Sequence, residues 1–306
     1  MKVTKTVKNI LAKYESDNPA TKANLARILC TGKLAGTGKM IILPVDQGFE
    51  HGPARSFAPN APAYDPHYHY QLAIDAGLNA YASTLGMLEA GADTFAGQVP
   101  TILKINSSNS WATTADSSVN ASVDDAVRLG CAAVGFTVYP GSDKALGMFE
   151  EFREIAAEAK AKGIAVVLWS YPRGGNISKA GETAADVGSY AAHIAAELGA
   201  HIIKVKLPSD HLEQEAAKKV FIEQGIPVTT QADRVREVMR AAFNGRRLVV
   251  FSGGDKKAAS SVYDDARAIR DGGGNGSIIG RNTFQRPRED AIKMLNQIMD
   301  IYKGKA

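Results

Sequence analysis

Eight short apolar segments, separated by stretches with helical periodicity, are the feature that most constrains the fold. They comprise residues 39–46, 78–84, 101–106, 131–138, 164–171, 201–207, 247–253 and 276–280. Alternation of such segments with amphipathic helices is typical of repeated βα units around a parallel sheet. Eight units are the number that a (β/α)₈ or TIM barrel requires, so we predict this α/β fold for residues 39–306.

Two features of the chain leave alternatives to this fold open. Residues 226–231, IPVTTQ, have the composition of a ninth strand, which the barrel does not accommodate, and we assign them to a long excursion after the sixth strand. An open doubly wound sheet is the other arrangement, although no GxGxxG follows the first strand. Residues 1–38 are predicted to form a helical extension, and without a linker rich in Ser, Gly or Pro we predict one domain over residues 1–306.

Composition excludes several classes of protein. Of the 306 residues 45% are apolar and 22% charged, as in ordinary globular proteins, and the net charge of +4 is too small to indicate a nucleic-acid partner. No apolar run has the length of a membrane span or the position of a signal peptide, so we expect a cytoplasmic enzyme. Cys30 and Cys131 are too far apart in sequence to indicate a disulfide framework or a thiolate metal site.

Polar residues gather at the ends of the predicted strands, where barrel enzymes place their active sites. The residues are Asp46, Lys104, Trp169, Tyr171, Arg173, Lys204, Lys206, Ser252, Gly253, Gly254, Gly280 and Arg281. A purely structural barrel has no reason to collect a carboxylate, a phenol, amines and glycine turns at one end. The pattern therefore predicts a catalytic site.

The ends of the last two strands are glycine-rich. Glycine lets backbone N–H groups approach a ligand closely, and barrels frequently bind phosphate after strands seven and eight. Residues 252–254, SGG, and 280–282, GRN, are thus predicted to form a phosphate cradle, with Arg281 adding charge-assisted hydrogen bonds. The alternative is that these glycines serve only tight βα turns.

Two lysines occupy one face of the strand at 201–207, because alternation places Ile202, Lys204 and Lys206 on the same side. A buried lysine can be an amine nucleophile when its pKa is lowered from about 10.4 to near 7, which means destabilising the ammonium by about 5 kcal/mol. Lys206 and Lys104 could supply the neighbouring cation that favours the neutral amine. The alternative is a structural pairing of these lysines with interior carboxylates such as Asp46.

The roles of the remaining polar residues stay open at this point. Trp169 and Tyr171 share a face and could be core aromatics, or Tyr171 could exchange protons with a substrate at the rim. Asp46 could be a base, a hydroxyl-binding group or a counter-ion. A long loop is expected after the first strand, and the spacing of its histidines, His51, His67 and His69, gives no support for a metal site.

Five segments, ILPVDQGFEHGP, LWSYPRGG, ELGAHIIKVK, FSGG and IIGRNTFQR, together resemble the archaeal-type class I fructose-1,6-bisphosphate aldolases, the DhnA-like branch of Schiff-base aldolases. The resemblance extends from Thr31 to Tyr302. It implies a (β/α)₈ barrel, cleavage of a phosphorylated ketose without metal or cofactor, and assembly into rings of five or ten subunits. Neither nucleic acid nor membrane is an expected partner.

The resemblance also implies individual roles. The Schiff-base lysine falls on Lys204, the acid/base tyrosine on Tyr171 and the strand-one aspartate on Asp46, while Trp169 lines the site. The cradle residues would bind one substrate phosphate, and candidates for the second are Arg55, Arg173 and Lys256.

The chain departs from its relatives in two places. His201 stands where relatives carry an aspartate, but its side chain should face away from the barrel interior. The segment 208–245 is longer than in short archaeal members, and its role is open.

Two rival functions remain. One is a transferase that moves an aldol fragment onto an amino-acid semialdehyde, or an aldolase for another phosphorylated sugar, on the same scaffold. The other is a binding or regulatory protein that recognises phosphate without catalysis.

Overall fold

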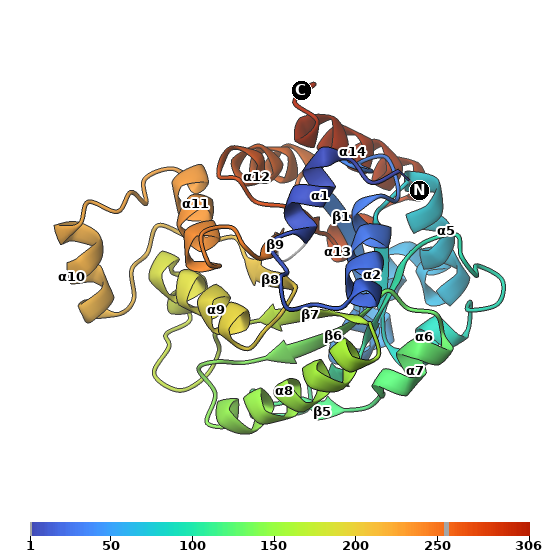
Figure 1. Cartoon of the computed structure of the whole chain (residues 1–306), viewed down its shortest axis with the longest axis horizontal. Helices are drawn as coiled ribbons and strands as arrows, with labels where there is room; N and C mark the ends of the chain where they lie inside the picture. Colours follow the sequence, from blue (N-terminus) through green and yellow to red (C-terminus); the bar gives the residue numbers. More distant parts are fainter. Residues whose placement is uncertain (1, 254–256) are drawn as a thin grey trace.

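The computed structural model describes residues 2–253 and 257–306. Within them, eight parallel strands close into a barrel in the order β1-β10-β9-β8-β7-β6-β3-β2, which confirms the predicted (β/α)₈ fold (Figure 1). The strands are β1 Met40–Val45, β2 Ala80–Ser83, β3 Thr101–Lys104, β6 Ala133–Val138, β7 Ala165–Ser170, β8 Ile202–Lys206, β9 Leu248–Ser252 and β10 Gly276–Ile278. Residues 226–230 form no strand, and α11 begins at Gln231.

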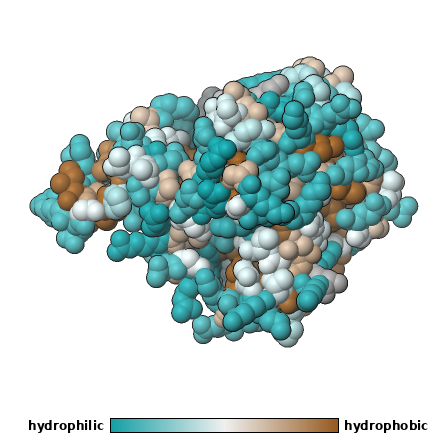
Figure 2. Space-filling model, turned by 90° about the horizontal axis from the view of Figure 1, so that it is seen from above, coloured by the Kyte–Doolittle hydropathy of each residue, from teal (hydrophilic) through white to brown (hydrophobic). Residues whose placement is uncertain are grey.

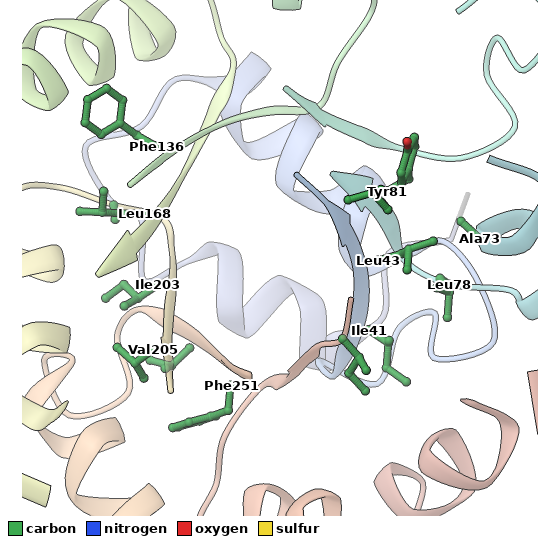
Figure 3. Packing of buried hydrophobic residues seen from close by; sticks show 14 of the residues in the cluster. Ile41, Leu43, Ala73, Leu78, Tyr81, Phe136, Leu168, Ile203, Val205 and Phe251 are labelled. Atoms are coloured by element: carbon green, nitrogen blue, oxygen red, sulfur yellow. The ribbon is translucent and has the colours of Figure 1, made fainter. Parts of the chain in front are cut away.

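Helices surround the barrel and cover its outer face. They are α5 Pro66–Ala76, α6 Leu85–Glu89, α7 Val123–Arg128, α8 Ala145–Ala161, α9 Ala185–Glu197, α11 Gln231–Ala241, α12 Ala259–Asp271 and α14 Arg288–Tyr302. Alternate strand residues, including Leu43, Phe136 and Ile203, point outward and pack under these helices (Figure 3). Because both faces of each strand are buried, the strands appear in the sequence as continuous apolar runs.

The predicted helical extension closes the amino end of the barrel. Helix α1 Lys5–Leu11 places Val7, and helix α2 Pro19–Leu29 places Leu25 and Ile28, in the same inner core as Ile202 and Val250. Between the two helices, the buried hydroxyl of Tyr14 donates to the backbone carbonyl of His201 and accepts from the N–H of Leu248. These contacts cover the amino ends of the barrel strands within the described residues.

His201 takes part in this closure and does not approach the opposite end of the barrel. Its Nδ1 accepts a hydrogen bond from the N–H of Val166, and its Nε2 lies 3.0 Å from an Asp17 carboxylate oxygen. The His201 side chain therefore faces away from the carboxyl ends of the strands and contributes to the structure at the amino end.

The segment after β1 is not the long loop that the sequence suggested. It folds into α3 Gln47–His51, α4 Pro53–Phe57 and a 3-10 helix η1 Ala58–Tyr64 before α5 begins. Helix α4 begins with Pro53, which suits the first helical position because its missing N–H would be unpaired there anyway. Asp65 then caps α5 by accepting a hydrogen bond from the N–H of His67.

Five further elements complete the described chain. A small antiparallel hairpin, β4 Asn106–Ser107 and β5 Ser118–Val119, follows β3, and a 3-10 helix η2 Gly181–Thr183 precedes α9. Helix α10 Glu215–Glu223 projects from the side of the molecule, and α13 Arg281–Phe284 follows β10 (Figure 1). Within the described ranges, no helix combines the length and apolar character needed to cross a membrane.

Candidate active site

A polar cavity of about 100 Å³ lies at the carboxyl ends of the strands. It brings together most of the residues that the sequence singled out: Asp46, Tyr171, Arg173, Lys204, Lys206, Ser252, Gly253, Gly280 and Arg281. Gly254 and Lys256 lie outside the described residues, and Arg55 lines neither this cavity nor its neighbour. The predicted clustering of polar strand ends is thus seen in the structure.

Lys204 lies at the floor of this cavity. Its side chain extends from β8 and is only 5% exposed, with Nζ 5.1 Å from the ring centroid of Tyr171 and 5.5 Å from that of Trp169. Both aromatic residues belong to the β7 end of the barrel, where Trp169 pairs in register with Lys204. An amine between two aromatic faces has few water molecules to stabilise its charge.

Burial lowers the pKa of Lys204 to about 8, and the positive charges of Lys104 and Arg173 act in the same direction. The carboxylates of Asp46 and Glu50 oppose this shift, because they stabilise the ammonium. The outcome is an amine with an appreciable neutral fraction near pH 7, as a Schiff-base nucleophile requires.

Lys206 differs from the prediction. Its Nζ donates to a Glu182 carboxylate oxygen at 3.1 Å, and the side chain is partly exposed at the rim. The largest electrostatic influences on the pKa of Lys204 come from other residues. Lys206 lies two residues beyond Lys204 on β8, in register with Ser252 of β9. From there its side chain extends to Glu182 of η2 and not into the barrel interior. The structure therefore assigns the neighbouring cations to Lys104 and Arg173.

Lys104 and Trp169 lie beneath the cavity and do not line it. The Lys104 Nζ donates to the backbone carbonyl of Asn106 at 2.5 Å and lies 3.8 Å from Asp46 and 3.9 Å from Glu50. The sequence offered ion pairing of interior lysines with Asp46 as an alternative, and in the structure Lys104 makes this pair. The prediction that Lys104 and Trp169 contact substrate has no support in this geometry, since both are about 1% exposed.

Glu50 was not among the predicted site residues; the sequence left its segment with loop packing or substrate contact as open roles. Asp46 precedes α3, and the first turn of this helix brings Glu50 back over the cavity, where its backbone N–H bonds the Asp46 carbonyl at 3.1 Å. Burial and the negative charge of Asp46 raise the pKa of Glu50 to about 7. The signal in the sequence was the i,i+4 spacing of two acids, which has meaning only if the segment is helical.

Tyr171 and Arg173 share the β7 side of the mouth. Burial raises the pKa of Tyr171 well above its ordinary value, and the carboxylates of Asp46 and Glu50 add to this effect, so the phenol is protonated at neutral pH. The Arg173 guanidinium lies over the rings of both Tyr171 and Tyr139, 5.2 and 5.5 Å from their centroids. These stacked contacts hold a cation at the rim.

Gly280 forms one side of the predicted phosphate cradle and must be glycine. A Cβ there would lie 2.8 Å from the Gln47 side-chain nitrogen and 2.9 Å from the Pro44 carbonyl oxygen. Gly253 approaches from the neighbouring strand end, and both glycines line the same cavity. The glycine-containing ends of β9 and β10 therefore lie at the same cavity, as predicted.

The three histidines of the α3–α5 region do not converge. His67 bonds the carbonyl of Ala90, His69 is buried against the carbonyl of Ala63, and only His51 lines the cavity. In the part of the chain that the structure describes, no group of three or more His, Cys, Asp or Glu residues could hold a metal ion.

Comparison with known proteins places this site in a family. A model of the DeoC/LacD family aldolases matches residues 40–286. The chain belongs to this aldolase family. It is 37% identical to the class 1 fructose-bisphosphate aldolase of Thermoproteus tenax, over 89% of this chain and 92% of that protein. It is 33% identical to a probable class 1 fructose-bisphosphate aldolase of Chlamydia muridarum, over 97% of this chain and 88% of the relative.

A solved structure shows the same likeness in three dimensions. An archaeal fructose-1,6-bisphosphate aldolase, with its catalytic lysine covalently bound to the carbinolamine intermediate of the substrate, aligns with a TM-score of 0.76 and 33% identity. The alignment covers 91% of this chain and 99% of that one. The fold and family of this aldolase are therefore established by independent comparisons.

Proposed function

We propose that this protein is a class I fructose-bisphosphate aldolase, which reversibly cleaves fructose 1,6-bisphosphate to dihydroxyacetone phosphate and glyceraldehyde 3-phosphate. The observation that carries the proposal is Lys204, a buried amine whose pKa of about 8 suits it for nucleophilic attack. It lies in one cavity with Tyr171, Asp46 and the glycine cradle. Relatives at 33–37% identity with the same named activity support the choice of substrate.

The first steps form an iminium on Lys204. The neutral amine attacks the C2 carbonyl of the open-chain ketose, and Asp46 carries a proton from the nitrogen to the C2 oxygen to give a carbinolamine. The Tyr171 phenol, protonated because its pKa is raised, donates a proton to the departing hydroxyl, which leaves as water. The iminium cation then lies beside the Tyr171 phenolate, an arrangement that stabilises both charges.

Cleavage uses the Tyr171 phenolate that dehydration leaves behind. The Tyr171 phenolate takes the proton of the C4 hydroxyl, the C3–C4 bond breaks, and its electron pair moves into the iminium to give an enamine. The cradle of Ser252, Gly253, Gly280 and Arg281 would hold the C1 phosphate and so orient C2 toward Lys204. Release of dihydroxyacetone phosphate follows protonation and hydrolysis of the enamine.

Borohydride trapping tests the proposal. The protein is incubated with dihydroxyacetone phosphate, reduced, digested and analysed by mass spectrometry, and we expect the reduced adduct on Lys204. The variant Lys204→Met should give no adduct and no cleavage of fructose 1,6-bisphosphate. Lys206→Met is the matched control, because this lysine pairs with Glu182 at the rim and should leave the adduct intact. An adduct on another residue, or none, would contradict the assignment.

We further propose that the enzyme works in the cytoplasm, in glycolysis or gluconeogenesis, as a homo-oligomeric ring of five or ten subunits. Its two cysteines are free thiols, which suits a reducing compartment. Large apolar side chains are exposed on three helices, Leu146 at the start of α8, Tyr190 on α9 and Ile222 on α10, and the α10 end of the molecule carries apolar surface (Figure 2). Native mass spectrometry tests the assembly, and a monomer at micromolar concentration would contradict it.

A further inference from the structure

A second cavity, of about 290 Å³, adjoins the one that contains Lys204. The two share four lining residues, Glu50, His51, Tyr139 and Arg173, so they lie side by side at the mouth of the barrel. The far wall of the second cavity is the connection between β4 and β5, residues 108–115, which we call the hairpin loop. None of the catalytic steps described above uses this loop.

The topology of the barrel places the hairpin loop across the mouth from the phosphate cradle. The loop lies between β3 and β6, and the cradle lies at the ends of β9 and β10. In the strand order β1-β10-β9-β8-β7-β6-β3-β2, β10 is opposite β6 and β9 is opposite β3. A substrate with one end in the cradle and its second carbon at Lys204 would therefore extend its other end toward the hairpin loop.

The chemistry of the hairpin loop suits a hydroxylated anion. Its lining residues are Ser108, Asn109, Ser110, Ala112, Thr113, Thr114 and Ala115, which offer four hydroxyls and one amide beside the methyl groups of two alanines. Hydroxyl groups can both donate to phosphate and carbonyl oxygens and accept from sugar hydroxyls. Opposite them, Arg173 supplies a permanent charge and is held in place over Tyr139 and Tyr171.

The loop has a defined shape. The side-chain oxygen of Asn109 accepts hydrogen bonds from the N–H groups of Trp111 and Ala112, at 2.9 and 3.2 Å, which closes a local turn. Asn109 therefore sets the loop conformation, while Thr113 and Thr114 line the cavity. The side chain of Trp111 is 92% exposed at the tip of this turn.

We propose that the hairpin loop is the element that determines acceptor specificity: with Arg173, it binds the aldehyde half of the substrate, a phosphorylated hydroxyaldehyde. The inference rests on the proposed aldolase function. The donor half, carbons one to three, occupies the cradle and Lys204. The aldehyde half, carbons four to six, occupies the second cavity, and Thr113 and Thr114 contribute their hydroxyls to its phosphate or its hydroxyl group.

The test separates the two halves of the reaction. The double variant Thr113→Val, Thr114→Val keeps the shape of both side chains and removes only their hydroxyls. Two quantities are measured: the extent of borohydride trapping with dihydroxyacetone phosphate, and the KM for glyceraldehyde 3-phosphate in the condensation direction. Ser118→Ala, on exposed β5 of the same hairpin but outside the cavity lining, is the control.

We expect trapping to be unchanged and the KM for glyceraldehyde 3-phosphate to rise roughly tenfold, the effect of losing two ordinary hydrogen bonds. Ser118→Ala should change neither quantity. Normal trapping with an unchanged KM in the double variant would overturn the assignment of the hairpin loop while leaving the aldolase proposal standing. Failure of the unaltered protein to trap dihydroxyacetone phosphate would overturn the aldolase function, and the acceptor assignment with it.

Discussion

Glu50 and Lys204 belong to one buried cluster in which each charge alters the protonation of the other. The Glu50 carboxylate stabilises the ammonium form of Lys204 and so raises the pKa of that amine. Removing the charge in Glu50→Gln should lower the Lys204 pKa, and the neutral amine should then persist to lower pH. The acid limb of the pH profile of kcat/KM, set near pH 8 by Lys204, should move toward lower pH.

The pH profile of kcat/KM for fructose 1,6-bisphosphate checks this prediction. Glu182→Gln is the matched control, because Glu182 pairs with Lys206 at the rim and is not among the main influences on Lys204. If the acid limb stays in place or moves to higher pH in Glu50→Gln, the Glu50 charge does not raise the pKa of the Lys204 amine.

Tyr171 is expected to matter more for bond cleavage than for formation of the Schiff base. In Tyr171→Phe the proton for dehydration can still come from Glu50, whose pKa of about 7 leaves it part protonated at neutral pH. The C4 proton must then go to a carboxylate that does not occupy the position of the lost phenol, so we predict a fall in kcat of roughly 10²–10⁴-fold. Borohydride should still trap substrate on Lys204, and an unchanged kcat would remove Tyr171 from proton transfer.

Single residues differ in how far the sequence alone could place them. Lys204, Tyr171 and Asp46 lie at strand ends, and strand alternation is a local property that fixes which way such side chains point. Glu50 was missed because its position depends on the folding of α3, and the pairing of Lys206 with Glu182 depends on η2. Contacts made through connecting segments are not encoded in the periodicity of any one strand.

At the scale of elements, α10 and α11 differ in how many of their residues are buried, and this difference predicts how much each helix contributes to stability. Helix α10 buries none of its residues and projects from the barrel, whereas α11 buries Val235, Val238 and Met239 (Figure 1). Lys219→Pro and Arg236→Pro each place a proline at an exposed helical site. The substitution in α11 should cost about 3 kcal/mol or more of unfolding free energy, while that in α10 should cost less than about 0.5 kcal/mol at protein concentrations too low for subunits to associate.

Urea unfolding checks this pair of variants. A large loss of stability for Lys219→Pro would mean that α10 packs against something, such as a second subunit, in solution. Measuring both variants across a range of protein concentrations distinguishes that case, because stabilisation by assembly depends on concentration.

The elements were predictable to different degrees for a physical reason. The barrel strands are buried on both faces, and each appears as a short apolar run whose limits agree with the structure within about two residues. The segment 47–64 carries the prolines, glycines and asparagine typical of loops, and its short helices persist because the barrel mouth packs against them. Closure of the barrel by Tyr14 joins residues 187 positions apart in sequence, beyond the reach of any local pattern.

At the scale of the whole molecule, the site has a cost in folding stability. Polar groups concentrated at the open end of the barrel include an amine that is nearly completely buried, and burial of a charge opposes folding. The unfolded chain holds Lys204 at its ordinary pKa of 10.5, and the folded chain lowers it to about 8. This difference corresponds to about 3 kcal/mol, since one pKa unit is about 1.36 kcal/mol.

Replacing Lys204 with methionine should therefore stabilise the protein by about 1–3 kcal/mol at pH 7 while abolishing catalysis. Below pH 8 the amine is protonated in both the folded and unfolded states, so the folded state bears the full cost. As pH rises from 8 toward 10.5 the folded state loses its proton first, the cost declines, and the advantage of Lys204→Met should disappear. Urea unfolding at pH 7 and pH 10 measures both values, with the exposed Lys219→Met as control. Equal stability of Lys204→Met and the unaltered protein at pH 7 would mean that Asp46 and Glu50 fully offset the burial of the ammonium.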